Sequence, residues 1–71
     1  MNKQVIGKRL KDLRGDKSQT EVTKSIGISP AALSMYENGE RIPKDDIKVK
    51  LAEYYESSVE SIFYAQEGHE V

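Results

Sequence analysis

The stretch from Gln19 to Asn38 constrains the fold of this chain most, because it holds two short helix patterns almost end to end. Ser18, with Glu21 three residues later, forms the capping-box pattern that begins a helix. Gly27 suits the left-handed backbone at a helix end, and Ser29-Pro30 provide the N-cap and first position of the next helix. Only about three residues lie between these helices, so we expect them to cross steeply rather than to pack antiparallel.

Apolar residues at helical spacing predict three more helices, over residues 2–14, 44–56 and 59–64. No strand pattern is present, and residues 65–71 follow neither period. We therefore expect an all-α fold, a compact five-helix bundle over residues 1–64 followed by a flexible tail over residues 65–71. The apolar stripes consist of Ile6, Leu10 and Leu13, then of Ile47, Leu51 and Tyr54 or Tyr55, and last of Val59, Ile62 and Phe63.

The composition excludes several classes of protein. With 71 residues the chain is one domain with little core to spare. It has no cysteine, which excludes disulfides and cysteine metal sites and suits a reducing cytoplasm. No stretch approaches the roughly 18 apolar residues of a membrane span, so we expect a cytoplasmic protein without membrane association.

Charge is unevenly distributed along the chain. The net charge is -1, whereas domains that bind nucleic acid are usually basic. Residues 1–17, however, carry six basic and two acidic side chains, and residues 57–71 carry three acidic ones and no Lys or Arg. Because salt screens charges beyond about 8 Å, phosphates respond to a local basic patch, and the N-terminal end still permits nucleic-acid binding.

The order and spacing of these signals resemble the phage-repressor (Cro-like, XRE) helix-turn-helix family. The matching segments, which span residues 5–63, are IGKRLKDLR, SQTEV, IGIS, LSMYENGERIP, LAEYY and SVESIF. The resemblance implies a lambda-repressor-like DNA-binding domain whose third helix lies in the major groove of double-stranded DNA.

The resemblance also implies roles for single residues. Gln19 matches the residue that binds a phosphate at the start of the second helix, and Asn38 matches a backbone contact after the third. Arg14 and Glu37 match an internal ion pair, which agrees with the several kcal/mol that an unpaired buried charge costs. The implied core positions are Val22, Ile26, Leu33, Tyr36, Leu51, Val59 and Ile62.

The face of the third helix that should meet bases carries small or apolar side chains. None of them is Arg, Lys, Asn or Gln, the types that form bidentate bonds to bases. Pro30 and Ala31 suit a thymine methyl, Ser34 suits a base edge or phosphate, and Met35 offers an adaptable apolar surface. We therefore expect much of the specificity to come from DNA shape. The expected DNA-binding residues are Lys8, Gln19, Ser29, Pro30, Ala31, Ser34, Met35, Asn38, Arg41 and Lys44.

Each of these features also has a purely structural interpretation. The basic residues of the first helix could form a solvated face, and Arg41 and Lys44 could be ordinary loop charges. The small face of the third helix could pack against a partner protein, and Met35 could be a surface or dimer residue.

The chain departs from the family pattern at four places. The turn Gly15–Lys17 is short and has Lys17 where an apolar residue is common, which puts the angle of the first helix in doubt. The other departures suggest a thin core. They are Thr23 in place of an alanine, Asp45 and Lys48 at positions that are often apolar, and Ser57 in place of a valine.

We expect a sequence-specific DNA-binding transcriptional regulator, a repressor that binds a palindromic operator as a homodimer with half-sites about 34 Å apart. The expected dimer surface is the C-terminal end, although all four candidates there could instead close the core, which is the preferred role of Ile62. The alternative is a protein-interaction module, such as an antitoxin or a coactivator-like helix-turn-helix, which the acidic pI and the apolar face favour. The dimer candidates are Tyr55, Ile62, Phe63 and Tyr64.

An enzyme is not expected, nor is any metal or cofactor. The chain has one histidine, His69, in the expected tail, and we expect it to be inert rather than a general base or metal ligand. The carboxylates of the fourth helix have the pattern of a solvated face. They are Asp45, Asp46, Glu53 and Glu56.

Overall fold

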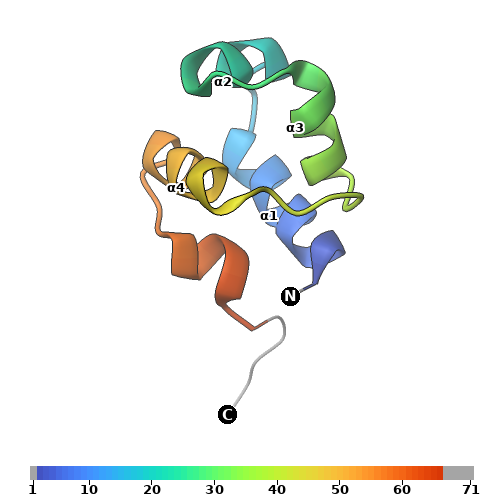
Figure 1. Cartoon of the computed structure of the whole chain (residues 1–71), viewed down its shortest axis with the longest axis vertical. Coiled ribbons are helices and arrows are strands. Elements are labelled where there is room, and N and C mark those ends of the chain that lie inside the picture. The colour runs from blue at the N-terminus through green and yellow to red at the C-terminus, as the bar shows by residue number, and fades with distance from the viewer. Residues whose placement is uncertain (1, 67–71) are drawn as a thin grey trace.

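This computed structural model describes residues 2–66 of the chain, which contain five helices (Figure 1). They are α1 (Lys3–Arg14), α2 (Gln19–Ile26), α3 (Pro30–Glu37), α4 (Asp45–Tyr54) and η1 (Glu60–Tyr64), the last a short π-helix. Residues 2–66 contain no strand, so the predicted all-α class and the order of helices are confirmed. The helix predicted over residues 44–56 stops at Tyr54, and the positive φ of 54° at Glu56 takes the chain out of helical conformation.

Serine hydroxyls cap three of the helices, including the caps Ser18 and Ser29 that were predicted from the sequence. The hydroxyl oxygens of Ser18, Ser29 and Ser58 each accept a hydrogen bond from the backbone N–H three residues later, at 3.0 to 3.1 Å. α2 ends at Gly27, whose φ of 80° is a left-handed conformation that glycine adopts without strain. These local signals therefore fix both sides of the turn between α2 and α3.

The core forms where α1, α2, α3, α4 and η1 meet. Burial of a large apolar side chain contributes about 1.5–3 kcal/mol, so a few residues carry much of the stability of so small a domain. The core positions implied by the family resemblance are buried, except for Val59, which is half-buried. The largest fully buried side chains are Ile6, Leu10, Val22, Leu33, Leu51 and Ile62.

Leu13 departs from the predicted apolar stripe of α1, because its side chain is 38% exposed. It lies with Ser57 and Ser61 along a surface groove between the end of α1 and η1. These small polar side chains leave Leu13 partly uncovered. Ser57, which stands where the family often has a valine, therefore leaves the core thinner at this place, as the departures from the family pattern suggested.

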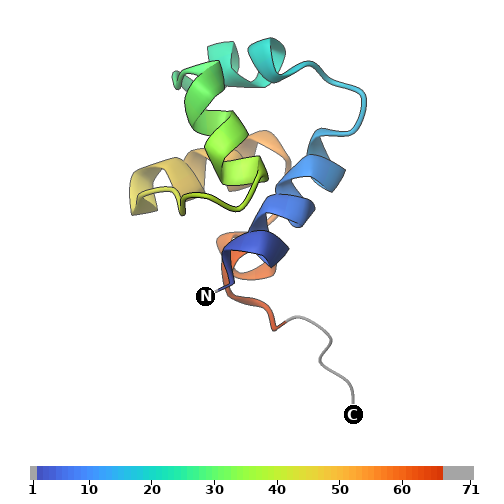
Figure 2. The same ribbon diagram turned by 90° about the vertical axis from the view of Figure 1, so that its right-hand side faces the viewer.

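The close contact between α1 and the end of α3 depends on Gly7. A Cβ atom at this position would lie 2.4 Å from the backbone oxygen of Glu37. Any side chain would therefore push the two helices apart, and the lower end of α3 lies directly beside α1 (Figure 2). The sequence pattern did not identify this residue.

Arg9 anchors the C-terminal end of the described chain to α1. Its guanidinium donates hydrogen bonds to the backbone oxygens of Ile62 at 2.9 Å, Ala65 at 2.8 Å and Ser61 at 3.3 Å. Ala65, which was expected to begin the flexible tail, is thus bonded to the folded domain. Residues 67–71 of that tail, which include His69, lie outside the described residues.

Lys48 is a buried lysine that joins α4 to η1. Its amine donates to the Tyr64 hydroxyl at 3.0 Å and to the Asp45 carboxylate at 3.4 Å, and it lies 5.0 Å from the centre of the Tyr64 ring. The hydrogen bond with Tyr64 raises the pKa of Lys48, so the amine stays charged. A position that is often apolar in the family is thus filled by a lysine stem whose charge has partners.

Candidate nucleic-acid interface

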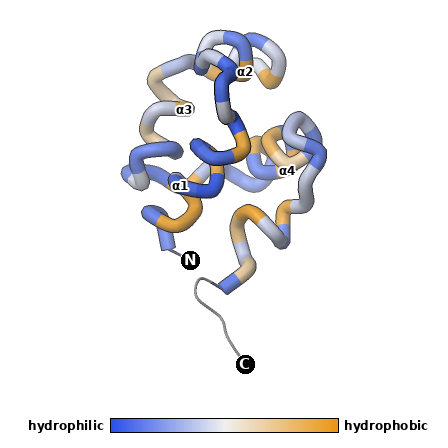
Figure 3. Tube along the Cα trace, turned by 180° about the vertical axis from the view of Figure 1, so that it is seen from behind, coloured by the Kyte–Doolittle hydropathy of each residue, from blue (hydrophilic) through white to orange (hydrophobic). Residues whose placement is uncertain are grey.

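α2 and α3 lie together at one end of the molecule, away from η1 (Figure 1). α2 lies across the beginning of α3 rather than alongside it, as the short turn predicted. Leu33 and Tyr36 attach α3 to the core, and their opposite side carries the small residues. Seen from behind, the hydrophilic turn between α1 and α2 runs along the outside of the molecule (Figure 3).

The expected reading face occupies the outer side of α3. Ser29, Pro30 and Ala31 are exposed, whereas Ser34 and Met35 are half-buried. The Ser29 hydroxyl oxygen is the N-cap acceptor of α3, but its hydrogen is not used in that bond. The face is therefore small, accessible at its N-terminal turn and free of charged side chains.

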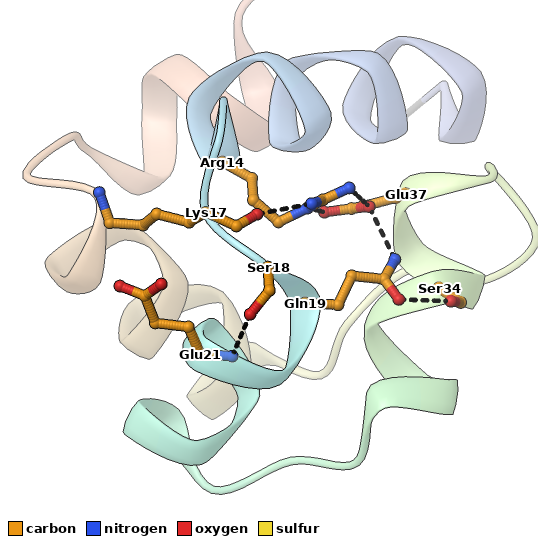
Figure 4. A network of polar contacts seen from close by, with 7 residues as sticks. All are labelled: Arg14, Lys17, Ser18, Gln19, Glu21, Ser34 and Glu37. Carbon is orange, nitrogen blue, oxygen red and sulfur yellow. Dashed lines mark hydrogen bonds and ion pairs between the residues drawn. The ribbon is translucent and has the colours of Figure 1, made fainter.

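Arg14 and Glu37 form the expected ion pair beneath this face (Figure 4). The Arg14 Nε donates to one carboxylate oxygen of Glu37 at 2.7 Å and Nη2 donates to the other at 3.0 Å. The Glu37 side chain is 1% exposed, and its hydrogen bond raises the pKa of Arg14 above the ordinary arginine value. This bidentate pair connects the end of α1 to the end of α3.

The same arginine closes the short turn after α1. Its Nη1 donates to the backbone oxygen of Lys17 at 2.7 Å, and the Lys17 N–H donates to the backbone oxygen of Arg14 at 3.1 Å. The Lys17 side chain is exposed, so its departure from the family pattern removes nothing from the core. Thr23, the departure within α2, is buried with its hydroxyl bonded to the backbone oxygen of Thr20 at 3.1 Å.

Gln19 and Ser34 are bonded to each other, which the sequence did not predict. The Gln19 Nε2 donates to Glu37 Oε1 at 3.0 Å, and its Oε1 accepts from the Ser34 hydroxyl at 3.1 Å (Figure 4). Both side chains were expected to face DNA independently. Nothing in their sequence separation indicates that the two side chains meet, because the contact depends on how α2 crosses α3.

Exposed basic and amide side chains follow the C-terminal end of α3 and lie on α1 beside it. Asn38, Arg41 and Lys44 are exposed in the segment between α3 and α4. Lys8 is exposed on α1 and pairs with Asp12 at 3.0 Å, a surface pair that contributes little and leaves the amine accessible. The groove between α1 and the end of α3 also contains Gln4 and Lys11, an amide and a basic side chain that the sequence analysis did not single out for DNA. It is lined by Gln4, Lys8, Lys11, Asp12, Glu37 and Asn38.

Two of the six basic residues at the N-terminal end do not contribute to a surface patch. Arg9 is bonded to backbone oxygens near the chain end, and Arg14 is bonded to Glu37. The excess of positive charge on the surface is therefore smaller than the number of basic residues in 1–17 indicated. The loop cations Arg41 and Lys44 become correspondingly more important to any phosphate contact.

Two of the four dimer candidates are buried, which confirms the core role preferred for Ile62 and makes Phe63 wrong as a dimer-surface residue. Ile62 and Phe63 are 1% and 2% exposed, because η1 turns them into the core. Tyr64 is 48% exposed, and Tyr55 is half-buried with its hydroxyl inside. Only the outer part of Tyr64 and the uncovered part of Tyr55 remain available to a second chain.

The described residues contain no metal-binding arrangement of acidic or histidine side chains. Asp45, Asp46, Glu53 and Glu56 are exposed, as a solvated face requires. Across residues 2–66, no helix has the length and apolar character needed to cross a membrane.

Known proteins share both the sequence pattern and this arrangement. The model of the helix-turn-helix family matches residues 8–62, which include α2 and α3. The uncharacterized HTH-type transcriptional regulator YvzC of Bacillus subtilis (strain 168) is 36% identical over 52 residues, which make up 73% of this chain and 68% of that protein.

Two solved structures resemble the fold closely. The P22 c2 repressor has a TM-score of 0.83 at 23% identity, with 89% of this chain and 98% of that one covered. The restriction-modification controller protein C.AhdI from Aeromonas hydrophila has a TM-score of 0.76 at 26% identity, with 84% and 94% covered. The chain therefore belongs to the phage-repressor (Cro-like, XRE) helix-turn-helix family.

Proposed function

We propose that this chain is a sequence-specific DNA-binding transcriptional regulator, a repressor that acts in the cytoplasm on a palindromic operator. The observation that carries the proposal is the outer face of α3, small and uncharged, with exposed amide and basic side chains following it. Such a face lets the helix approach base edges closely, while the flanking groups hold phosphates. The P22 c2 repressor, which shares the fold, was solved in complex with a synthetic operator.

The proposed contacts with DNA form two sets, one to phosphates and one to bases. Asn38, Arg41, Lys44 and Lys8 hold phosphates and set the register, and one N–H of Gln19 joins them. Pro30 and Ala31 meet thymine methyl groups, and Met35 fills the groove beside them. Ser29 keeps a hydroxyl hydrogen for a base or phosphate. With so few hydrogen bonds to bases, DNA shape and deformability supply much of the discrimination.

Selection of binding sites from random duplexes tests this proposal. The wild-type chain should enrich a common sequence, and Ala31→Glu should abolish the enrichment by placing a carboxylate against the bases and phosphates. Ser57→Glu adds the same charge after α4, away from α3, and should select the same sequence as wild type. Enrichment by Ala31→Glu as strong as that by wild type would refute the assignment of the reading face.

A homodimer would bind the two halves of a palindrome, with centres about 34 Å apart. Tyr64 is the candidate for this contact, because it is the exposed aromatic residue of η1. Sedimentation at micromolar concentration with the selected DNA should show two copies per duplex. A run without DNA gives the state of the free chain for comparison. Tyr64→Ala should weaken pairing more than Val49→Ala, which truncates another exposed apolar residue on α4. A single copy per duplex would contradict the dimer.

A protein-interaction module is the second candidate, and the charge favours it. The chain has a net charge of -1, and Arg9 and Arg14 are bonded internally. In this case the uncharged face of α3 would pack against a partner protein. Failure of the wild-type chain to enrich any duplex, together with capture of a partner that Ala31→Glu loses, would favour this function over DNA binding.

A further inference from the structure

The side-chain amide of Gln19 is held on both sides by residues of α3. Its Nε2 donates to Glu37 at 3.0 Å and its Oε1 accepts from Ser34 at 3.1 Å (Figure 4). The Glu37 carboxylate only accepts hydrogen bonds, so it requires the Nε2 side of the amide. The Oε1 atom is then left for Ser34, which must be the donor. Two neighbours of fixed polarity therefore set the orientation of the amide.

This arrangement decides which side chain can still donate to DNA. A serine hydroxyl has one hydrogen, and that of Ser34 is used by Gln19. Phosphate oxygens are acceptors, so Ser34 has nothing to donate to them while this bond is present. Gln19 has two hydrogens on Nε2, of which Glu37 takes one. The free donor of this pair therefore belongs to Gln19.

We propose that Ser34 is a positioning residue, whose hydroxyl holds the Gln19 amide so that its second Nε2 hydrogen meets a DNA phosphate. This inference rests on the proposed function and deepens it. Ser34 does not read a base or bind a phosphate itself. It couples the position of α3 in the groove to the phosphate contact at the start of α2, and the bases are left to the apolar residues of α3.

A purely structural role for Ser34 predicts a different pattern of effects. If the hydroxyl served only to satisfy Gln19, Ser34→Ala would alter thermal stability and leave DNA affinity unchanged. A positioning role predicts lost DNA affinity that disappears when Gln19 is absent. Ser25 provides a matched control, because its hydroxyl also bonds within the chain, to the Glu21 backbone oxygen at 3.2 Å.

The affinity test is a double-mutant cycle on the duplex recovered by selection with the wild-type chain. Ser34→Ala should weaken binding about five-fold, the effect of one hydrogen bond. In the Gln19→Ala background the same change should weaken it by less than about two-fold, because its effect passes through Gln19. Ser34→Thr, which keeps the hydroxyl, should restore most of the affinity, and Ser25→Ala should bind as wild type.

Nuclear magnetic resonance of the free protein gives a second readout that requires no DNA. The Gln19 Nε2 proton that is bonded to Glu37 should exchange slowly in wild type and faster in Ser34→Ala. The Arg14 Nε–H, bonded to Glu37, should be unchanged in both. Ser25→Ala should leave all these signals in place, and its unfolding temperature should match that of Ser34→Ala.

The outcomes separate the two proposals. If wild type enriches a duplex but Ser34→Ala binds it equally well, or if the losses from Ser34→Ala and Gln19→Ala simply add, the positioning role is overturned and the proposed function stands. Unchanged Gln19 amide exchange in Ser34→Ala would also overturn the positioning role. If wild type enriches no duplex, both proposals fall.

Discussion

The two arginines of α1 are both bonded inside the molecule, but to different kinds of acceptor. Arg14 forms a bidentate pair with the Glu37 carboxylate, which is 1% exposed. Arg9 bonds backbone oxygens of η1 and Ala65, with no carboxylate involved. The first joins two opposite charges and orders the side chains beside the reading face. The second holds the chain end against α1.

Lys48, at the same end as Arg9, extends this contrast. Its nearest carboxylate, Asp45, is 97% exposed, and its other partners are the Tyr64 hydroxyl and the aromatic rings of η1. Removing Lys48 or Arg9 therefore leaves behind acceptors that water can reach or that carry no charge. Removing Arg14 leaves a buried carboxylate. Replacing a cation by methionine should therefore have a larger effect on stability at Arg14 than at Arg9 or Lys48.

The largest effect is expected from Arg14→Met. It leaves the Glu37 charge buried and unpaired, which should lower the free energy of unfolding by about 3 kcal/mol. Urea denaturation monitored by circular dichroism measures this loss. Lys8→Met, which removes one partner of the exposed pair with Asp12, should change stability by no more than about 0.5 kcal/mol. A loss below about 1 kcal/mol for Arg14→Met would show that the buried pair is not a main stabilising contact.

A smaller effect is expected from Arg9→Met. The variant loses hydrogen bonds to backbone oxygens that are partly reached by solvent, which should reduce stability by about 2 kcal/mol. The loss should be local, so amide hydrogen exchange should accelerate in η1 before it does so in α2 or α3. Uniform acceleration in all helices would contradict a role confined to the chain end.

Lys48→Met is expected to change stability by less than about 1 kcal/mol in either direction. Methionine has a similar length and can fill the space between α4 and η1 without a charge to desolvate. Thermal unfolding of this variant beside Arg14→Met compares the two ends directly. Equal losses in the two variants would remove the distinction between the paired and the weakly paired charge.

The smallest effect is expected from Tyr55→Phe. The Tyr55 hydroxyl is buried without a hydrogen-bond partner among the described residues, so removing it should be neutral or stabilise the fold by about 0.5 kcal/mol. Urea denaturation at neutral pH measures this difference. A loss of more than about 1 kcal/mol would show that the hydroxyl has a partner in solution.

Titration of Tyr55 should also make the stability of the fold depend on pH. Burial raises the pKa of Tyr55 to about 12, and the Glu37 carboxylate acts in the same direction. An unfolded tyrosine titrates near pH 10, so the folded state binds this proton more tightly. The resulting stability is complete below about pH 10 and is lost as the pH rises toward 12. Tyr55→Phe should therefore lose less stability than wild type over this range, and an equal loss would contradict the cause.

Local signals in the sequence were sufficient for the helices and for most of their ends, although the helix predicted over residues 44–56 ends at Tyr54. Ser18, Gly27 and Ser29 act through neighbours in the chain, so a pattern a few residues long identifies them. The ion pair of Arg14 with Glu37 was also expected, because the family resemblance supplied a contact that spacing alone does not give. The helix-turn-helix is therefore the part of this fold that the sequence predicts best.

Apart from the Arg14–Glu37 pair, contacts between distant residues were not predicted. The need for glycine at position 7 depends on the backbone of α3, and the acceptors of Arg9 lie near the other end of the chain. The sequence left Phe63 open between the core and a dimer surface, because a helix as short as η1 has too few residues to define one apolar face. The bond between Gln19 and Ser34 depends on a crossing geometry that no local pattern records.

The central claim is that this chain holds DNA through α3 and the exposed cations around it. Salt titration of wild-type binding to its selected duplex tests it most directly. With Lys8, Arg41 and Lys44 on phosphates, the logarithm of the binding constant should fall linearly with the logarithm of salt, with a slope of about -3 per bound copy. Arg41→Gln should reduce the slope by about 1. Binding that does not change with salt, or its absence at about 50 mM salt, would contradict the claim.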